Sequence, residues 1–123
     1  EACPCGSGAA YVACCDRFHA GTQAAPTAEA LMRSRYSAFV LDRLDYLLAS
    51  WHASTRPAVL APNEAVLKWL GLEVRRHHVI DADHATVEFV ARSKLGGRAH
   101  RLHEISRFVR EDGRWFYLDG EIG

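Results

Sequence analysis

The placement of its cysteines is the feature that most constrains this chain. All four, Cys3, Cys5, Cys14 and Cys15, lie near the start of the sequence, and none occurs in the rest. A disulfide framework needs cysteines spread along the chain, so that bridges close loops. Bridges between Cys3 and Cys5, or between the neighbours Cys14 and Cys15, would also force strained geometry. The crowding therefore favours one metal ion over disulfides.

Zinc is the ion that this ligand set predicts. Four thiolates around one point match tetrahedral zinc, with Zn–S distances of about 2.3 Å. Tyr11 is expected to start a short helical turn that brings the last two cysteines back to the ion. His19 is left out of the site because Cys15 completes the set. We therefore predict a closed, structural zinc knuckle over residues 1–18. The alternatives are a metal-free thiol cluster and a redox pair at Cys14-Cys15.

Composition limits the possible partners. With 123 residues the chain is long enough for one domain with a hydrophobic core and a small appendage. Its formal charge is zero, so it lacks the surplus of Lys and Arg with which proteins bind phosphates, and we expect no nucleic acid partner. No apolar run approaches the roughly 20 residues of a membrane span. Clustered thiols without a spread disulfide pattern indicate the reducing cytoplasm.

The first half of the sequence beyond the knuckle has helical spacing. Residues 19–26 form a connector rich in Gly, Ala and Pro, and Thr27 is a good N-cap for the helix that follows. The helical pattern breaks near Asp42 and resumes over residues 44–51, which predicts a second helix. A third, short helix is expected over residues 63–67, with its asparagine as the cap.

The second half changes to the period of β-strands. Segments rich in β-branched and aromatic residues follow one another at 72–80, 84–92, 100–110 and 114–118. The sequences that separate them are typical of hairpin turns: Asp81-Ala82-Asp83, Leu95-Gly96-Gly97 and Glu111-Asp112-Gly113. Helices followed by an antiparallel meander predict the α+β class, with the helices packed on one face of the sheet.

Two parts of the sequence resemble known families. The run Cys-Pro-Cys-Gly-Ser-Gly, followed by Tyr11 and by the paired cysteines, is similar to the SEC-C motif, a zinc-binding segment of the preprotein translocase ATPase SecA. Other segments are very similar to the YchJ (UPF0225-like) family of small bacterial proteins, and they span nearly the whole chain: residues 24–27, 31–40, 45–47, 51–52, 69–72, 106–108 and 114–120.

The resemblance carries expectations about fold and partners. The YchJ family implies a nuclear-transport-factor-like (NTF2-like, cystatin-like) cone over residues 19–123, in which a long curved antiparallel sheet wraps around the helices. SEC-C segments on SecA-like proteins recognise partners of protein export and translation. The resemblance therefore implies a protein partner linked to the export or translation machinery.

A cone of this kind leaves a cavity between sheet and helices, where a second function is expected. Strand alternation places Glu104 on the same face as apolar residues such as Phe108. If that face is inward, the Glu104 carboxylate must be paired or have a raised pKa, which makes it a site candidate. The candidate partners are Arg33, Arg35 and Arg107. The alternative to a binding role is a structural ion pair that closes the cone.

His52 is a candidate general base, because the pKa of an imidazole lies near neutrality. An isolated histidine is, however, more often a surface residue. The sequence contains no Walker loop, no dinucleotide-binding glycine motif and no G-x-S-x-G elbow. We therefore predict no catalytic residue set and keep Glu104, His52 and Arg107 only as candidates for the cavity.

Two functions from different classes follow from these observations. In the first, the protein is a zinc-stabilised interaction or adaptor module without enzymatic activity. In the second, the cone binds a small molecule, with acid–base chemistry supplied by Glu104 and His52. The first is favoured because four metal ligands are evident in the sequence and a catalytic pair is not.

Overall fold

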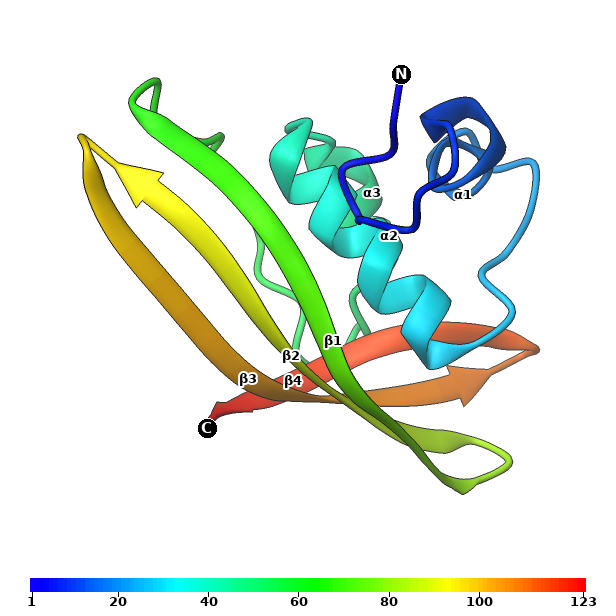
Figure 1. Ribbon diagram of the computed structural model, residues 1–123. Helices are drawn as coiled ribbons and strands as arrows, with labels where there is room; N and C mark the ends of the chain where they lie inside the picture. The colour runs from blue at the N-terminus through cyan, green and yellow to red at the C-terminus, as the bar shows by residue number, and fades with distance from the viewer.

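The computed structural model describes residues 1–123 and has two layers, a curved antiparallel sheet and a set of helices on its concave side (Figure 1). The strands follow one another across the sheet in sequence order: β1 (Leu67–Asp81), β2 (His84–Leu95), β3 (Arg98–Glu111) and β4 (Arg114–Ile122). The helical segments are a 3₁₀ turn (Tyr11–Ala13), α1 (Asp16–His19), α2 (Ala28–Val40) and α3 (Leu44–Ala49). The predicted α+β order and the meander are confirmed.

Tight turns join the strands at the three predicted places. The β2–β3 turn at Gly96-Gly97 has φ angles of 57° and 82°, and the β3–β4 turn at Asp112-Gly113 has φ angles of 51° and 77°. Two successive positive φ angles are typical of the type I′ turn, whose twist matches that of the flanking strands. In the β1–β2 turn, Asp81 accepts a hydrogen bond from the backbone N–H of Asp83. Strand pairing then continues beyond the predicted strand ends, so that β1 begins at Leu67.

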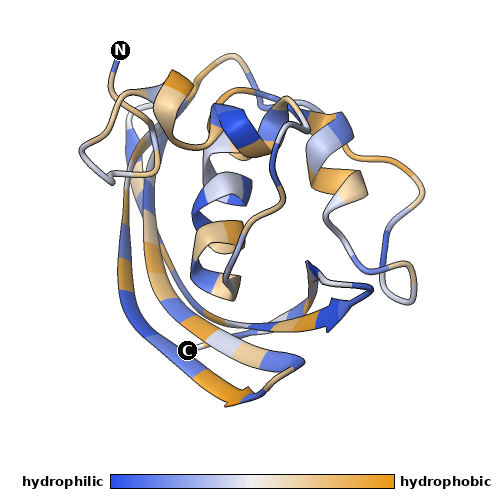
Figure 2. Cartoon of the chain, turned by 90° about the vertical axis from the view of Figure 1, so that its right-hand side faces the viewer, coloured by the Kyte–Doolittle hydropathy of each residue, from blue (hydrophilic) through white to orange (hydrophobic).

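The core lies between α2 and the concave face of the sheet. Alternate residues of β2, from Ala85 to Ala91, are buried against α2 together with Phe108 of β3. Figure 2 shows the sheet curving around the helices, with apolar residues recurring along its strands. The expectation of a sheet that wraps around helices is confirmed.

Helix α2 is buried on more than one side. Thr27 caps it, because its side-chain oxygen accepts the backbone N–H of Ala30 at 3.0 Å. The helix ends before Asp42, whose φ of 55° is incompatible with its continuation. Its sheet-facing side forms the core, and the N-terminal segment packs against it from the other side (Figure 1). Both the predicted cap and the predicted break are confirmed.

The prediction of a short helix over residues 63–67 is wrong. The Asn63 side chain donates a hydrogen bond to the carbonyl oxygen of Phe39 and accepts one from the indole of Trp69. It is therefore engaged in tertiary contacts instead of capping, and Leu67 begins β1. None of the helices combines the length and the apolar character that crossing a membrane requires.

Candidate functional site

The four cysteine sulfurs form one compact cluster. All lie within 4.8 Å of one another, and the Sγ atoms of Cys5 and Cys14 are 3.7 Å apart. A tetrahedron with Zn–S bonds of about 2.3 Å has edges of about 3.8 Å. Cys3, Cys5 and Cys15 are buried, and Cys14 is half-buried. The cluster therefore fits the donor set and the dimensions of a tetrathiolate zinc site.

Local backbone structure brings the thiols together. The loop after the first ligands turns through Gly6 and Gly8, with φ angles of 80° and 88°, which a side chain would make unfavourable. A backbone hydrogen bond from Cys3 to Ala9 closes this loop at 2.9 Å. The 3₁₀ turn that starts at Tyr11 then returns the chain to the cluster, as predicted.

Electrostatics in the cluster favour a cation. Hydrogen bonding, first of all with Cys15, lowers the pKa of Cys5 to about 4, although burial opposes this shift. The same interaction and burial raise the pKa of Cys15, and burial raises the pKa of Cys14. Without a metal these shifts favour the thiolate at Cys5 and the neutral thiol at Cys14 and Cys15. A divalent cation would compensate the repulsion among four thiolates at these distances.

The cysteine loop is attached directly to α2. The Arg33 guanidinium donates from Nη1 to the carbonyl oxygen of Cys5 at 3.0 Å. The Sγ of Cys3 lies 3.4 Å from the hydroxyl of Ser37, one helical turn further on. The cysteine cluster therefore forms part of the contact between the N-terminal segment and the helix.

His19 strengthens this attachment and is not a member of the sulfur cluster. Its Nδ1 lies 2.7 Å from the Tyr11 hydroxyl, and its Nε2 lies 2.8 Å from the carbonyl oxygen of Ser34 in α2. Burial lowers the pKa of His19. Both ring nitrogens are thus engaged in hydrogen bonds that join the knuckle to the helix. Sequence reasoning missed this role, because nothing in the local pattern indicates a contact 15 residues away.

Of the three cavity candidates, only Glu104 lines the cavity on the concave face of the sheet. Arg107 projects from the other face of β3 and pairs with Asp119 at 2.6 Å and Glu121 at 2.8 Å. The proposed pairing of Glu104 with Arg107 is therefore wrong, because residues an odd number of positions apart on a strand face opposite sides. The proposed pairing of Glu104 with Arg33 is also wrong, because Arg33 forms its ion pair with Glu29.

Arg35 and His52 also differ from expectation. Arg33 bonds Glu29 at 3.0 Å, whereas Arg35 enters the cavity without an ion pair to Glu104. His52 lies outside the cavity, with its Nε2 2.8 Å from the carboxylate of Glu111. The structure therefore does not assemble Glu104 and His52 into an acid–base pair.

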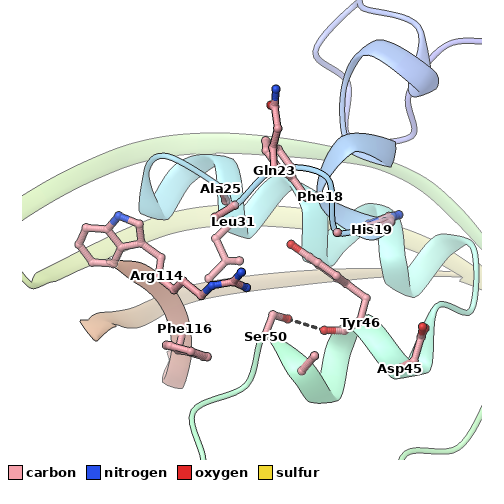
Figure 3. A pocket seen from close by; sticks show the side chains of 14 residues that line it. Phe18, His19, Gln23, Ala25, Leu31, Asp45, Tyr46, Ser50, Arg114 and Phe116 are labelled. Atoms are coloured by element: carbon pink, nitrogen blue, oxygen red, sulfur yellow. Dashed lines mark hydrogen bonds between the residues drawn. The ribbon is translucent and has the colours of Figure 1, made fainter. Parts of the chain in front are cut away.

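A second pocket, of about 330 Å³, lies between the connector, α3 and the start of β4. Phe18 and Ala25 line it from the N-terminal side, and Arg114 extends into it from β4 (Figure 3). No sequence pattern predicts this pocket, since its walls come from three distant parts of the chain.

Residues 27–120 match the family model described as YchJ, middle NTF2-like domain. This chain belongs to the UPF0225 (YchJ) family. A UPF0225 protein from Methylibium petroleiphilum is 69% identical over 121 residues, which cover 98% of this chain and 88% of the relative. A UPF0225 protein from Bordetella parapertussis is 62% identical over 123 residues, which cover 98% of this chain and 92% of that relative.

Solved structures extend this family relationship to the cysteine segment. A SEC-C motif containing protein from Rhodopseudomonas palustris has a TM-score of 0.85 at 34% identity, covering 97% of this chain and 96% of that one. A SEC-C motif containing protein from Psychrobacter arcticus has a TM-score of 0.80 at 30% identity, and the match covers 98% of this chain and 82% of that one. The UPF0225 chain thus combines a SEC-C motif with an NTF2-like domain, and both predictions are confirmed.

Proposed function

We propose that this protein is a non-enzymatic interaction module whose SEC-C segment is fixed by one structural zinc ion. The observation that carries the proposal is the closed set of four thiols packed directly on α2. Four protein ligands leave no open position for substrate or water, which distinguishes structural from catalytic zinc. The ion would then stabilise a surface and take no part in chemistry.

The pocket beside the knuckle is the surface that we assign to a partner. Phe18 follows the last ligand closely and lines the pocket together with apolar residues of the connector. Arg114 enters it from β4 and forms no ion pair within the chain, so it can bind a carboxylate of the partner. Loss of zinc would loosen the N-terminal wall of this pocket, which couples metal binding to partner binding.

The class of partner follows from the family resemblance. SEC-C segments on SecA-like proteins recognise components of protein export and translation, and we expect a component of one of these machineries here. Because thiolate ligands persist in a reducing compartment, we expect this interaction in the cytoplasm.

Two measurements test the proposal. Native mass spectrometry, compared with the acid-denatured protein, should give one zinc ion per chain, and Cys14→Ser should abolish that stoichiometry. Cross-linking in cells should then capture a partner with the wild type and with Arg98→Glu, an exposed control at the β2–β3 turn. Arg114→Glu should lose the partner while keeping its zinc. Zinc-free wild type, or capture that is insensitive to both Cys14→Ser and Arg114→Glu, would refute the proposal.

A further inference from the structure

The cavity on the concave face of the sheet has the chemistry of a small-molecule site. It measures about 240 Å³ and lies between α2 and the sheet, with aromatic side chains forming much of its wall, Trp69 and Phe89 among them. This volume is below the roughly 300–1,000 Å³ of pockets that hold drug-sized ligands. A ligand the size of one amino acid fits it better than a nucleotide or a peptide.

Arg35 supplies a buried positive charge at this cavity. The residue is only 4% exposed, and its guanidinium lies over the rings of Trp51 and Tyr117, at 4.9 Å and 4.5 Å from their centroids. Nη1 donates to the carbonyl oxygen of Leu47 and the hydroxyl of Ser50. Nε and Nη2 make no hydrogen bond within the protein, and no carboxylate lies within 4.0 Å. Arg35 therefore keeps donors for an acceptor in the cavity.

Glu104 supplies a negative charge at the same cavity. Its carboxylate accepts a hydrogen bond from Ser106 at 2.6 Å and has no basic partner among the ion pairs of the protein. A Cβ atom at position 120 would overlap this carboxylate, so Gly120 leaves the space that the Glu104 side chain occupies. The carboxylate keeps lone pairs free to accept further hydrogen bonds.

Trp51 adds a third unused polar group. Its indole Nε1 is buried and has no hydrogen-bond partner, although the side chain lines the cavity. Buried donors are normally paired, and an exception calls for an explanation. The Trp51 side chain lines the cavity, so its indole N–H signal reports on a molecule bound there.

Opposite charges at one cavity that do not contact each other select for a ligand that carries both signs. A simple anion would be attracted by Arg35 but repelled by Glu104, and a simple cation would meet the reverse. The geometry points to a free α-amino acid with an apolar side chain. Its carboxylate accepts from Arg35, its ammonium group donates to Glu104, and its side chain packs against Trp69 and Phe89.

Ligand analogues test this assignment without disturbing the buried arginine. L-leucine and L-phenylalanine are titrated into zinc-loaded protein while the indole N–H signal of Trp51 is followed by NMR. Each amino acid is compared with its analogue lacking the amine and its analogue lacking the carboxylate. The affinity for at least one amino acid should be about tenfold or more above the affinity for either of its analogues. Tenfold corresponds to about 1.4 kcal/mol of binding free energy.

A matched pair of variants provides the second test. Glu104→Gln should weaken amino-acid binding about tenfold and, because it removes the repelling carboxylate, should strengthen binding of the deaminated acid. Glu121→Gln, on the opposite face of the sheet, should bind like the wild type. Equal affinity for the deaminated acid in the wild type would assign a simple anion site and overturn the proposal, as would the absence of binding at millimolar concentration. Zinc content is measured in parallel, so failure here leaves the proposed interaction module untouched.

Discussion

Replacing His19 with alanine should destabilise the zinc-bound protein by about 3 kcal/mol. The imidazole is only 7% exposed, and it makes hydrogen bonds of 2.7 Å to Tyr11 and 2.8 Å to Ser34. Each bond contributes about 1 kcal/mol on average. Removal of the ring, whose centroid lies 4.7 Å from that of Tyr46, also leaves a void of comparable cost.

The assay is equilibrium unfolding in urea at neutral pH with zinc in excess, followed by far-ultraviolet circular dichroism. Tyr11→Phe is the matched control, because it removes one of the two hydrogen bonds and keeps the His19 ring in place. It should cost about 1 kcal/mol. In the His19→Ala background the same change should cost almost nothing, because its partner is already absent.

Two results would contradict this role of His19. A loss below about 1 kcal/mol for His19→Ala, at unchanged zinc content, would show that the histidine does not join the knuckle to α2. Fully additive effects of the two substitutions would show that the hydroxyl and the imidazole do not interact in solution.

Three further predictions concern pH, the core and a turn. Burial lowers the pKa of His19 below 6.5 in the folded state, so the stabilisation by neutral His19 is complete above pH 6.5 and declines at lower pH, where the unfolded chain takes up a proton. The difference in unfolding free energy between wild type and His19→Ala should therefore shrink from about pH 7.5 to about pH 5.5, and a growing difference would contradict this. Phe108→Ala, at a residue 2% exposed, should cost about 3–5 kcal/mol in the same assay, whereas Ile122→Ala, at a residue 72% exposed, should stay within about 0.5 kcal/mol. Gly113→Ala should cost about 1–2 kcal/mol, because φ at this position is 77°, and a neutral effect on the urea midpoint would contradict the turn geometry.

The features that could be predicted from sequence are those set by neighbours along the chain. The cap at Thr27, the break at Asp42 and the glycine-containing turn at Asp112-Gly113 depend on the conformational preferences of a few consecutive residues. The same holds for the thiol cluster, because its cysteines lie in one short loop and directly after one 3₁₀ turn. The failure at Asn63 has the opposite cause, since tertiary contacts with Phe39 and Trp69 engage the side chain that local sequence offers as a cap.

Patterns of consecutive residues thus predicted the four-cysteine cluster, the order of helices and strands, and the hairpin turns. Contacts between distant segments keep His52 apart from the cavity, join His19 to α2, and place Arg35 and Glu104 at one cavity without an ion pair. These relations depend on how the curved sheet wraps around α2. That curvature sets distances between residues far apart in the chain, and no pattern of consecutive residues specifies such distances.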